Sequence, residues 1–383
     1  MLQAAIETEV EEYIDRHKEQ RDEQGHRLVV RNGHQPERRI LTTLGPLSLT
    51  PPRVHDRREG CRFTSAILPP YLRRVPSIDA LVPALYLKGL STTEFPEALA
   101  AILGPGAAGL SSANIVRLKA VWEDEYKKWS ARSLAGKRYV YIWADGVYFN
   151  VRLQDGRSCV LVLMGALPDG TKELLAVWDG QRESKLSWSE VLSDLKRRGL
   201  EELPLLAVGD GALGFWAALR EVFPQTREQR CWVHKTANIL DLLPKKIQPH
   251  AKKMIHEMYM ADTRNHALSA YDAFFAVYEA KYPKACECLN RGKDELFTFY
   301  DFPAEHWQHL RTTNPIESTF ATVRLRTRRT KGCGSSTATL TMVFKLALEA
   351  QRHWRRLNGS QRLAQVIEGA KFIDGIKEGE QAA

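Results

Sequence analysis

The chain carries the sequence Tyr139-Val140-Tyr141-Ile142-Trp143-Ala144-Asp145-Gly146, in which six residues suited to a buried strand precede a carboxylate and a glycine. The chain stays extended to about Leu153, and two further strands follow before helices and strands alternate. The later predicted elements are strands at 159–166 and 173–178, a helix at about 184–198, a strand at 204–208, a helix at 213–222 and a strand at 226–232. This order predicts an α/β fold in which an antiparallel start leads into parallel strands.

Asp145 and Asp210 are both predicted at the carboxyl ends of strands, where ligands bind in α/β sheets. A glycine follows each of them, so the backbone can turn sharply and a ligand can approach closely. Two carboxylates placed side by side repel each other unless a cation neutralises them, and oxygen ligands suit Mg²⁺ or Mn²⁺. An Asp-Gly pair is more often a simple turn, which is our interpretation of the pairs at 155–156 and 169–170.

A third carboxylate, Glu317, lies at the start of a helix predicted at about 315–330. Arg324 and Arg328 fall on the same helix face, so a metal ligand here would have phosphate-binding arginines behind it. The alternative is a helix cap, with Asn314 as the N-cap and Glu317 as the third helical residue. The spacing alone leaves both interpretations open.

Length and composition bound the class of protein. With 383 residues, of which 44% are hydrophobic and 26% charged, the chain is predicted to be a soluble globular protein of two to four units. No apolar run is long enough to span a bilayer, so no membrane partner is expected, and the acidic N-terminus is unlike a secretory signal. Six scattered cysteines do not form a disulfide framework, which favours a reducing, cytoplasmic setting.

The net charge of +9 is concentrated in two basic blocks. Residues 26–75 contain ten arginines, no lysine and three acidic residues, and residues 311–356 contain ten basic and two acidic residues. Two such blocks suit a polyanion, because neutralising phosphates releases condensed counterions. A charge of this size also serves solubility alone, although the preference for arginine favours bidentate phosphate contact.

Residues 77–132 are predicted to form three helices, at about 78–88, 92–103 and 111–132. A short turn between the first two fits a helix-turn-helix unit, in which the third helix would contact DNA bases. The candidate contacts near the start of that helix are Asn114, Arg117 and Lys119. The alternative is a plain helical bundle, because the acidic residues at 123–125 would repel DNA.

Several short blocks of the sequence occur together in one known family. They are Arg31-Asn32-Gly33, Tyr86-Leu87-Lys88-Gly89-Leu90-Ser91-Thr92, Asp145-Gly146-Val147-Tyr148, Gly209-Asp210-Gly211-Ala212, Gly214-Phe215-Trp216, Gln229-Arg230-Cys231-Trp232-Val233-His234-Lys235 and Arg311-Thr312-Thr313-Asn314-Pro315-Ile316-Glu317-Ser318. With these blocks, in this order and over nearly the whole chain, the sequence resembles the bacterial insertion-sequence transposases related to eukaryotic Mutator elements, the MULE-like Asp-Asp-Glu family.

The resemblance implies a fold and an activity. The implied fold is a ribonuclease-H-like catalytic domain, interrupted by an all-helical insertion, in which Asp145, Asp210 and Glu317 hold two Mg²⁺ or Mn²⁺ ions per active site. Such enzymes cut double-stranded DNA at the terminal inverted repeats of their element and join it to target DNA. A homodimer or larger assembly is expected, because two element ends must be brought together.

The family's Cys-x-x-His element is present as Cys231 and His234, which is half of a zinc site. The conceivable further zinc ligands are Cys286, Cys288, His306 and His309. We favour instead a role beside the metal ligands or in contact with DNA, with Trp232 stacking on an unpaired base. The alternative is that these residues are buried at a strand end.

The predicted organisation divides the chain into DNA-binding and catalytic parts. The ranges are 1–25 (an amphipathic helix over 2–24), 26–76 (a basic, β-rich arm), 77–135 (a helix-turn-helix-like DNA-binding domain), 136–234 and 311–383 (the two parts of the catalytic domain, the second ending in a helix at about 338–357) and 235–310 (the helical insertion). The predicted phosphate contacts after Glu317 are Arg324, Arg326, Arg328, Arg329 and Lys331. Two rival hypotheses are a nuclease with the same triad that cuts without joining, and a non-catalytic DNA-binding protein.

Overall fold

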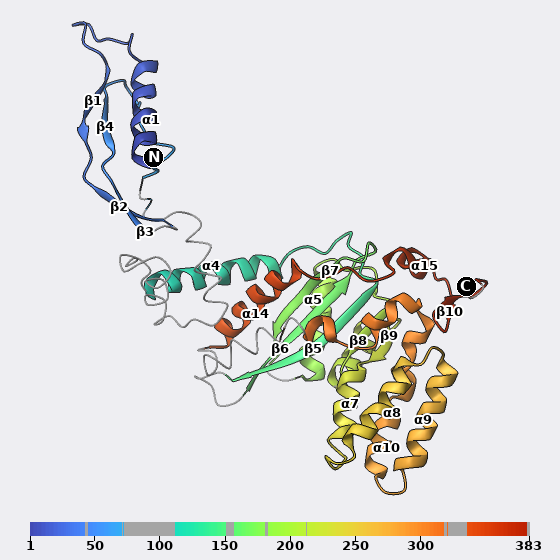
Figure 1. The fold of residues 1–383 in the computed structure, drawn as a ribbon. Helices are drawn as coiled ribbons and strands as arrows, with labels where there is room; N and C mark the ends of the chain where they lie inside the picture. The colour runs from blue at the N-terminus through green and yellow to red at the C-terminus, as the bar shows by residue number, and fades with distance from the viewer. Residues whose placement is uncertain are drawn as a thin grey trace. The chain divides into compact units, whose positions relative to one another are not determined.

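The computed structural model describes residues 1–42, 45–70, 72, 112–150, 157–180, 183–211, 213–317, 320 and 335–380. The chain forms two compact units, Met1–Leu118 and Lys119–Ala383, which we describe in turn (Figure 1). The helices predicted at 78–88 and 92–103 and the turn predicted at 155–156 lie outside the described residues. Among the described residues, no helix is long and apolar enough to cross a membrane.

The first unit begins with a helix followed by short antiparallel strands. Its elements are α1 (Leu2–Arg16), β1 (Val29–His34), which pairs with β4 (Pro52–Asp56), and β2 (Arg38–Thr42), which pairs with β3 (Gly45–Leu49). The apolar face of α1 contributes Ile6 and Val10 to the buried residues of this unit. The helix ends at Arg16 rather than near residue 24, because the Asp22 carboxylate accepts hydrogen bonds from the backbone N–H groups of residues 24 and 26 and fixes a turn there.

The second unit is built around a five-stranded mixed sheet with strand order β7-β6-β5-β8-β9. The strands are β5 (Tyr141–Asn150), β6 (Arg157–Ala166), β7 (Lys172–Asp179), β8 (Leu206–Gly209) and β9 (Arg227–Arg230). Strands β5, β6 and β7 pair antiparallel, whereas β5, β8 and β9 pair parallel. The predicted α/β class, with its antiparallel start and parallel finish, is confirmed.

One face of the sheet is covered by α5 (Lys185–Arg197) and α6 (Leu213–Val222). Ser184 begins α5 by accepting a hydrogen bond from the N–H of Ser187, and Trp188 packs edge-to-face on Phe215 of α6. Ile142 of β5 belongs to the same buried cluster. Because side chains alternate along a strand, its neighbours Tyr141 and Trp143 face the opposite side of the sheet.

The opposite side receives a long segment without strands, as predicted for the part of the chain before Glu317. Its elements are α7 (Trp232–Leu240), α8 (Gln248–Met260), α9 (Arg264–Tyr278), α10 (Pro283–Asn290), α11 (Lys293–Leu296), η1 (Thr298–Asp301), η2 (Ala304–His306) and α12 (Trp307–Leu310). The Tyr141 hydroxyl lies 2.9 Å from His306 Nδ1, and Trp143 Nε1 donates to the His309 carbonyl at 2.8 Å. These two contacts fasten the end of the helical segment to β5.

The remaining elements lie along β7 and at the C-terminal end. They are α4 (Ser112–Ser130), α14 (Ser336–Gln351), η3 (Ser360–Arg362), α15 (Leu363–Ile367), β10 (Phe372–Ile373) and β11 (Ile376–Lys377). Tyr126 and Phe344 join α4 to α14, and Gln351 accepts a hydrogen bond from the N–H of Leu174 in β7. The last long helix therefore ends at Gln351, shorter than the predicted 338–357, because its final residue is held by the sheet edge.

His309 gives the fold a predicted dependence on acid. Its pKa is lowered to about 4, first by burial and then by the Lys172 ammonium, and its Nε2 accepts the N–H of Asn358. In the unfolded chain the His309 imidazole is protonated below about pH 6.5, whereas in the folded chain it stays neutral down to about pH 4. The free energy of unfolding therefore falls as the pH drops from about 6.5 to about 4. We expect His309→Gln to reduce this loss of unfolding free energy by about 2 kcal/mol, allowing for partial exposure.

Urea denaturation at a series of pH values measures this effect. His353→Gln is the matched control, because His353 is exposed on the surface. Equal pH profiles for the two variants would contradict the assignment.

Candidate active site

Asp145 and Asp210 lie on neighbouring parallel strands, but only one of them follows the end of its strand. Asp210 comes directly after β8, as predicted. Asp145 lies within β5, which is a correction to the prediction: β5 continues to Asn150 because it stays paired with β6, and Asp145 stands opposite Val162. The parallel pairing with β8 ends two residues earlier, at Trp143, so the Asp145 carboxylate still lies near the end of β8. Asp145 is only 4% exposed to solvent.

Glu317 lies in a helical turn over residues 314–317. The helix begins one residue earlier than predicted, because the N–H of Glu317 donates to the carbonyl of Thr313 at 3.1 Å. Thr313, rather than Asn314, therefore occupies the N-cap position, and the predicted capping box is wrong. The Glu317 carboxylate instead accepts a hydrogen bond from the Thr313 hydroxyl at 3.0 Å, which fixes the direction of the side chain.

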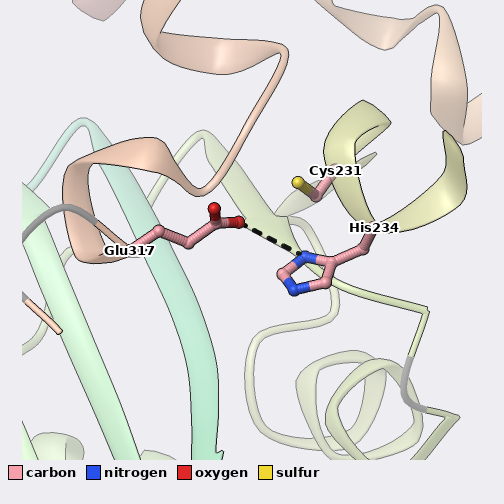
Figure 2. A group of neighbouring side chains, drawn as sticks. All are labelled: Cys231, His234 and Glu317. Atoms are coloured by element: carbon pink, nitrogen blue, oxygen red, sulfur yellow. Dashed lines mark ion pairs between the residues drawn. The ribbon is translucent and has the colours of Figure 1, made fainter. Parts of the chain in front are cut away.

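His234 interacts with two of the predicted metal ligands, Glu317 and Asp145. Its Nδ1 lies 3.7 Å from Oε1 of Glu317, and the two side chains point toward each other across the site (Figure 2). The pKa of His234 is raised to about 9, mainly by its hydrogen bond with Cys231 and further by the negative charges of Asp145 and Glu317. The aspartate from the sheet and the glutamate from the helix thus both favour the protonated form of His234.

Cys231 holds three parts of the chain in register around this group. Its N–H donates to the carbonyl of Gly209 at 2.7 Å, next to Asp210. Its Sγ accepts from the N–H of Thr313 at 3.3 Å and lies 3.4 Å from the Thr313 hydroxyl oxygen. Strand β9 ends at Arg230, so Cys231 is the N-cap of α7 and His234 lies in the first turn of that helix, not at a strand end.

Trp232 does not have the predicted role. It is fully buried, its indole Nε1 donates to the carbonyl of Leu296 at 2.8 Å, and its ring packs on Tyr259 and Phe297. A side chain enclosed in this way cannot stack on a DNA base. The prediction failed because a tryptophan beside a site residue looks the same in sequence whether it faces the ligand or the core.

Glu183 is a fourth carboxylate that the sequence did not indicate. It lies in the loop before α5, where a methyl group added at Gly146 would overlap its carboxylate. Its pKa is raised to about 7, first by burial and then by the charges of Asp210 and Asp145, while the Tyr148 hydroxyl hydrogen-bonds it. The one signal available was the glycine after Asp145, which leaves room for this side chain.

The possible metal ligands form one compact group among the residues that the structure describes. Ligand atoms of Cys231, His234 and Glu317 lie within 4.8 Å of one another. The carboxylates of Asp145, Asp210 and Glu317 are not gathered as closely, and Cys286, Cys288, His306 and His309 do not complete a zinc site with Cys231 and His234. The compact group therefore combines one carboxylate, from Glu317, with the thiol and imidazole of Cys231 and His234 at the start of α7.

The predicted DNA contacts cannot be placed around this centre. Positions 324–331 lie outside the described residues. The second group, Asn114, Arg117 and Lys119, falls on the backbone of α4, in the stretch 112–119 whose side chains lie outside the described part of the chain. Both groups stay predictions.

Comparison with known families gives the class of protein. The family described as "Transposase, Mutator family" matches residues 1–357. The chain belongs to the Mutator family of transposases. Membership in this family makes transposition its activity and confirms the prediction of an insertion-sequence transposase.

Two relatives of this Mutator-family transposase come from bacterial insertion sequences. The transposase for insertion sequence element IS6120 of Mycolicibacterium smegmatis is 52% identical over 78% of this chain and 92% of its own length. The transposase for IST2 of Acidithiobacillus ferrooxidans is 52% identical over 73% of this chain and 95% of its own length. Among solved structures, a Drosophila P element transposase strand transfer complex covers 73% of this chain and 85% of its own, with 11% identity and a TM-score of 0.22, which supports no structural argument.

Proposed function

We propose that Asp145, Asp210 and Glu317 hold two divalent ions, Mg²⁺ or Mn²⁺, and that the protein cuts and joins double-stranded DNA at the inverted repeats of its element. The observation that carries the proposal is that these carboxylates act on the same neighbours: Asp145 and Asp210, from adjacent parallel strands, both raise the pKa of Glu183, and Asp145 and Glu317 both raise the pKa of His234. The strand order β7-β6-β5-β8-β9, with its first three strands antiparallel, supports a ribonuclease-H-like arrangement.

The donor set fits hard cations. Carboxylate oxygens are the ligands that Mg²⁺ and Mn²⁺ prefer, and the ions would polarise a phosphate and activate a water or a DNA 3′-hydroxyl. Glu183 adds a further carboxylate, and its raised pKa reflects the negative potential that Asp145 and Asp210 create. Carboxylates that share an ion approach one another because its charge offsets their repulsion. His234 and Thr313 would orient Glu317 toward that centre.

The domain roles follow from this assignment. Residues 26–135 would bind the inverted repeats, residues 235–310 would form the insertion, and Arg324, Arg326, Arg328, Arg329 and Lys331 would hold phosphates beside the cut. Because two DNA ends must meet, the active form would be a homodimer or a larger assembly.

Cleavage of DNA carrying the element's ends tests the proposal. We expect the purified full chain to release the end with Mg²⁺ or Mn²⁺, to lose this activity on chelation, and to join a pre-cut end to a second duplex. Cleavage without joining would instead support the nuclease hypothesis. DNA binding without any cleavage under these conditions would support the non-catalytic one and contradict ours.

Gly146→Ala tests whether Glu183 belongs to the site. The added methyl group must displace the Glu183 carboxylate, and a displacement of about 1 Å at a reacting centre costs about 10²-fold in rate. We therefore expect end cleavage to fall by about that factor while DNA binding is retained. Glu183→Gln separates charge from crowding, and Glu190→Gln on the exposed side of α5 is the control. A wild-type rate in Gly146→Ala would remove Glu183 from the site.

A further inference from the structure

A small pocket lies beside the end of β8, on the side of Asp210 that faces α7 and α10. Its volume is about 100 Å³, enough for one tetrahedral anion but not for a nucleotide. Arg230 and Lys235 line its buried wall, and Leu213, Asn238 and Arg291 form an exposed rim. It is therefore open to solvent on one side and cationic on the other.

The two cations are buried, and neither forms an ion pair within 4.0 Å with an acid of the part of the chain that the structure describes. Arg230 is 8% exposed and Lys235 is 7% exposed. Arg230 donates to the carbonyls of Arg291 at 2.7 Å and Gly211 at 3.1 Å, and Lys235 Nζ donates to the carbonyls of Cys288 and Arg291, both at 2.7 Å. Carbonyl groups satisfy hydrogen bonds but do not neutralise charge.

The neighbouring groups do not remove this excess of positive charge. Glu295 offsets only part of it: its charge raises the pKa of Lys235, although less than burial and Arg230 lower it, and its carboxylate also lies 3.9 Å from the exposed Arg220. The pKa of Lys235 is lowered to about 8 by burial, and the charges of Arg230 and Arg291 contribute to this, which is the expected consequence of like charges close together. An anion in the pocket would relieve both the burial and the repulsion.

The position of the pocket connects it to the active site. Gly211 follows Asp210 directly, and Cys231, which also lines the pocket, hydrogen-bonds the Glu helix through Thr313. A chain of phosphates passing Asp210 would therefore place one phosphate at the pocket while another lies at the carboxylates. The N-terminal end of α7, a nine-residue helix, adds a partial positive charge on the same side.

We propose that this pocket binds one backbone phosphate of the DNA strand that is cut, through Arg230 and Lys235, and so holds that strand in register at Asp210. The inference rests on the proposed function, since that function supplies the DNA. Asn238 and Arg291 on the rim contact the same phosphate or its neighbour. The pocket contributes to binding and positioning of the strand and takes no part in the chemistry.

Binding of an end-containing duplex by the full chain, in chelator and over a range of salt concentrations, tests the proposal. Asn238→Asp puts a negative charge on the rim without disturbing the buried bonds, and Lys235→Met removes a cation. We expect each to weaken binding by about tenfold at low salt, and to lower the slope of log Kd against log salt by about 1. Asn265→Asp and Lys284→Met are matched controls at exposed positions of α9 and α10.

The outcomes distinguish a DNA phosphate from a free phosphate ion as the ligand, and the pocket proposal from the proposed catalytic function. If both pocket variants bind DNA as their controls do, the proposal is overturned. If, in addition, inorganic phosphate raises the melting temperature of the wild type, the pocket is a site for a small anion only. Asn238→Asp keeps the test valid if Lys235→Met fails to fold. Because binding is measured without metal, failure of the catalytic assignment would appear in cleavage assays and leave this result unchanged.

Discussion

Asp145→Asn is expected to lower the rate of end cleavage by about 10³-fold or more, while affinity for the same DNA stays within about twofold. The substitution keeps the size of the side chain but removes the charge that would hold a divalent ion, and an ion of this kind contributes several kcal/mol to the transition state. Asp145 is buried in β5, so its position is fixed by the sheet, and Glu183, the carboxylate beside it, comes from a different element. Cleavage and binding are measured on one labelled duplex carrying the element end.

Asp241→Asn is the matched control for this prediction. It makes the same chemical change at the exposed C-terminal end of α7. We expect its rate to equal that of the wild type. Cleavage by Asp145→Asn at the control rate would show that this carboxylate is not part of the catalytic group.

Trp232→Ala is expected to destabilise the protein by about 3–5 kcal/mol, the cost of removing a fully buried aromatic ring. The ring fills the space between α7, α8 and the turn at Phe297, and its indole N–H bonds the carbonyl of Leu296. The loss would also loosen the first turn of α7, which carries His234. Chemical denaturation followed by fluorescence of the remaining tryptophans measures the change.

The neighbouring residue supplies a control for the tryptophan. Val233 is exposed, and Val233→Ala should change stability by less than about 0.5 kcal/mol. A base-stacking role for Trp232 would give the opposite pattern, with weaker DNA binding at unchanged stability. That pattern would contradict the buried contacts described above.

The sequence predicted the sheet and two of its carboxylates because those signals are local. A run of apolar residues before Asp145 and another before Asp210 indicates buried strands, although only Asp210 and its glycine follow the end of a strand. The sequence predicted an extended chain to about Leu153, but it did not show that Asp145 lies inside the strand, because that depends on the pairing of β5 with β6. Strand length here depends on a partner that is remote in sequence.

The surroundings of the site escaped prediction for the same physical reason. Glu183 lies in a loop whose sequence resembles any polar connection, and only the packing of α5 brings it over Gly146. Thr313, the N-cap, is held in place because Cys231 accepts its N–H, a contact between residues 82 positions apart. The burial of Arg230 and Lys235 likewise depends on the helices after β9, which are remote from the strand in sequence.

The helical segment from α7 to the Glu helix begins and ends at neighbouring positions beside the sheet. The N–H of Trp232 donates to the carbonyl of Arg311 at 2.9 Å, so the two ends of the segment are hydrogen-bonded to each other. The entropy cost of closing such a loop rises only with the logarithm of its length. Residues can therefore be added to or removed from the far end of this segment at small thermodynamic cost, while Glu317 keeps its distance from His234. The far end of the inserted helices can therefore change in length while the bonds at its base, such as those of Trp232 to Arg311 and Tyr141 to His306, keep the active site in place.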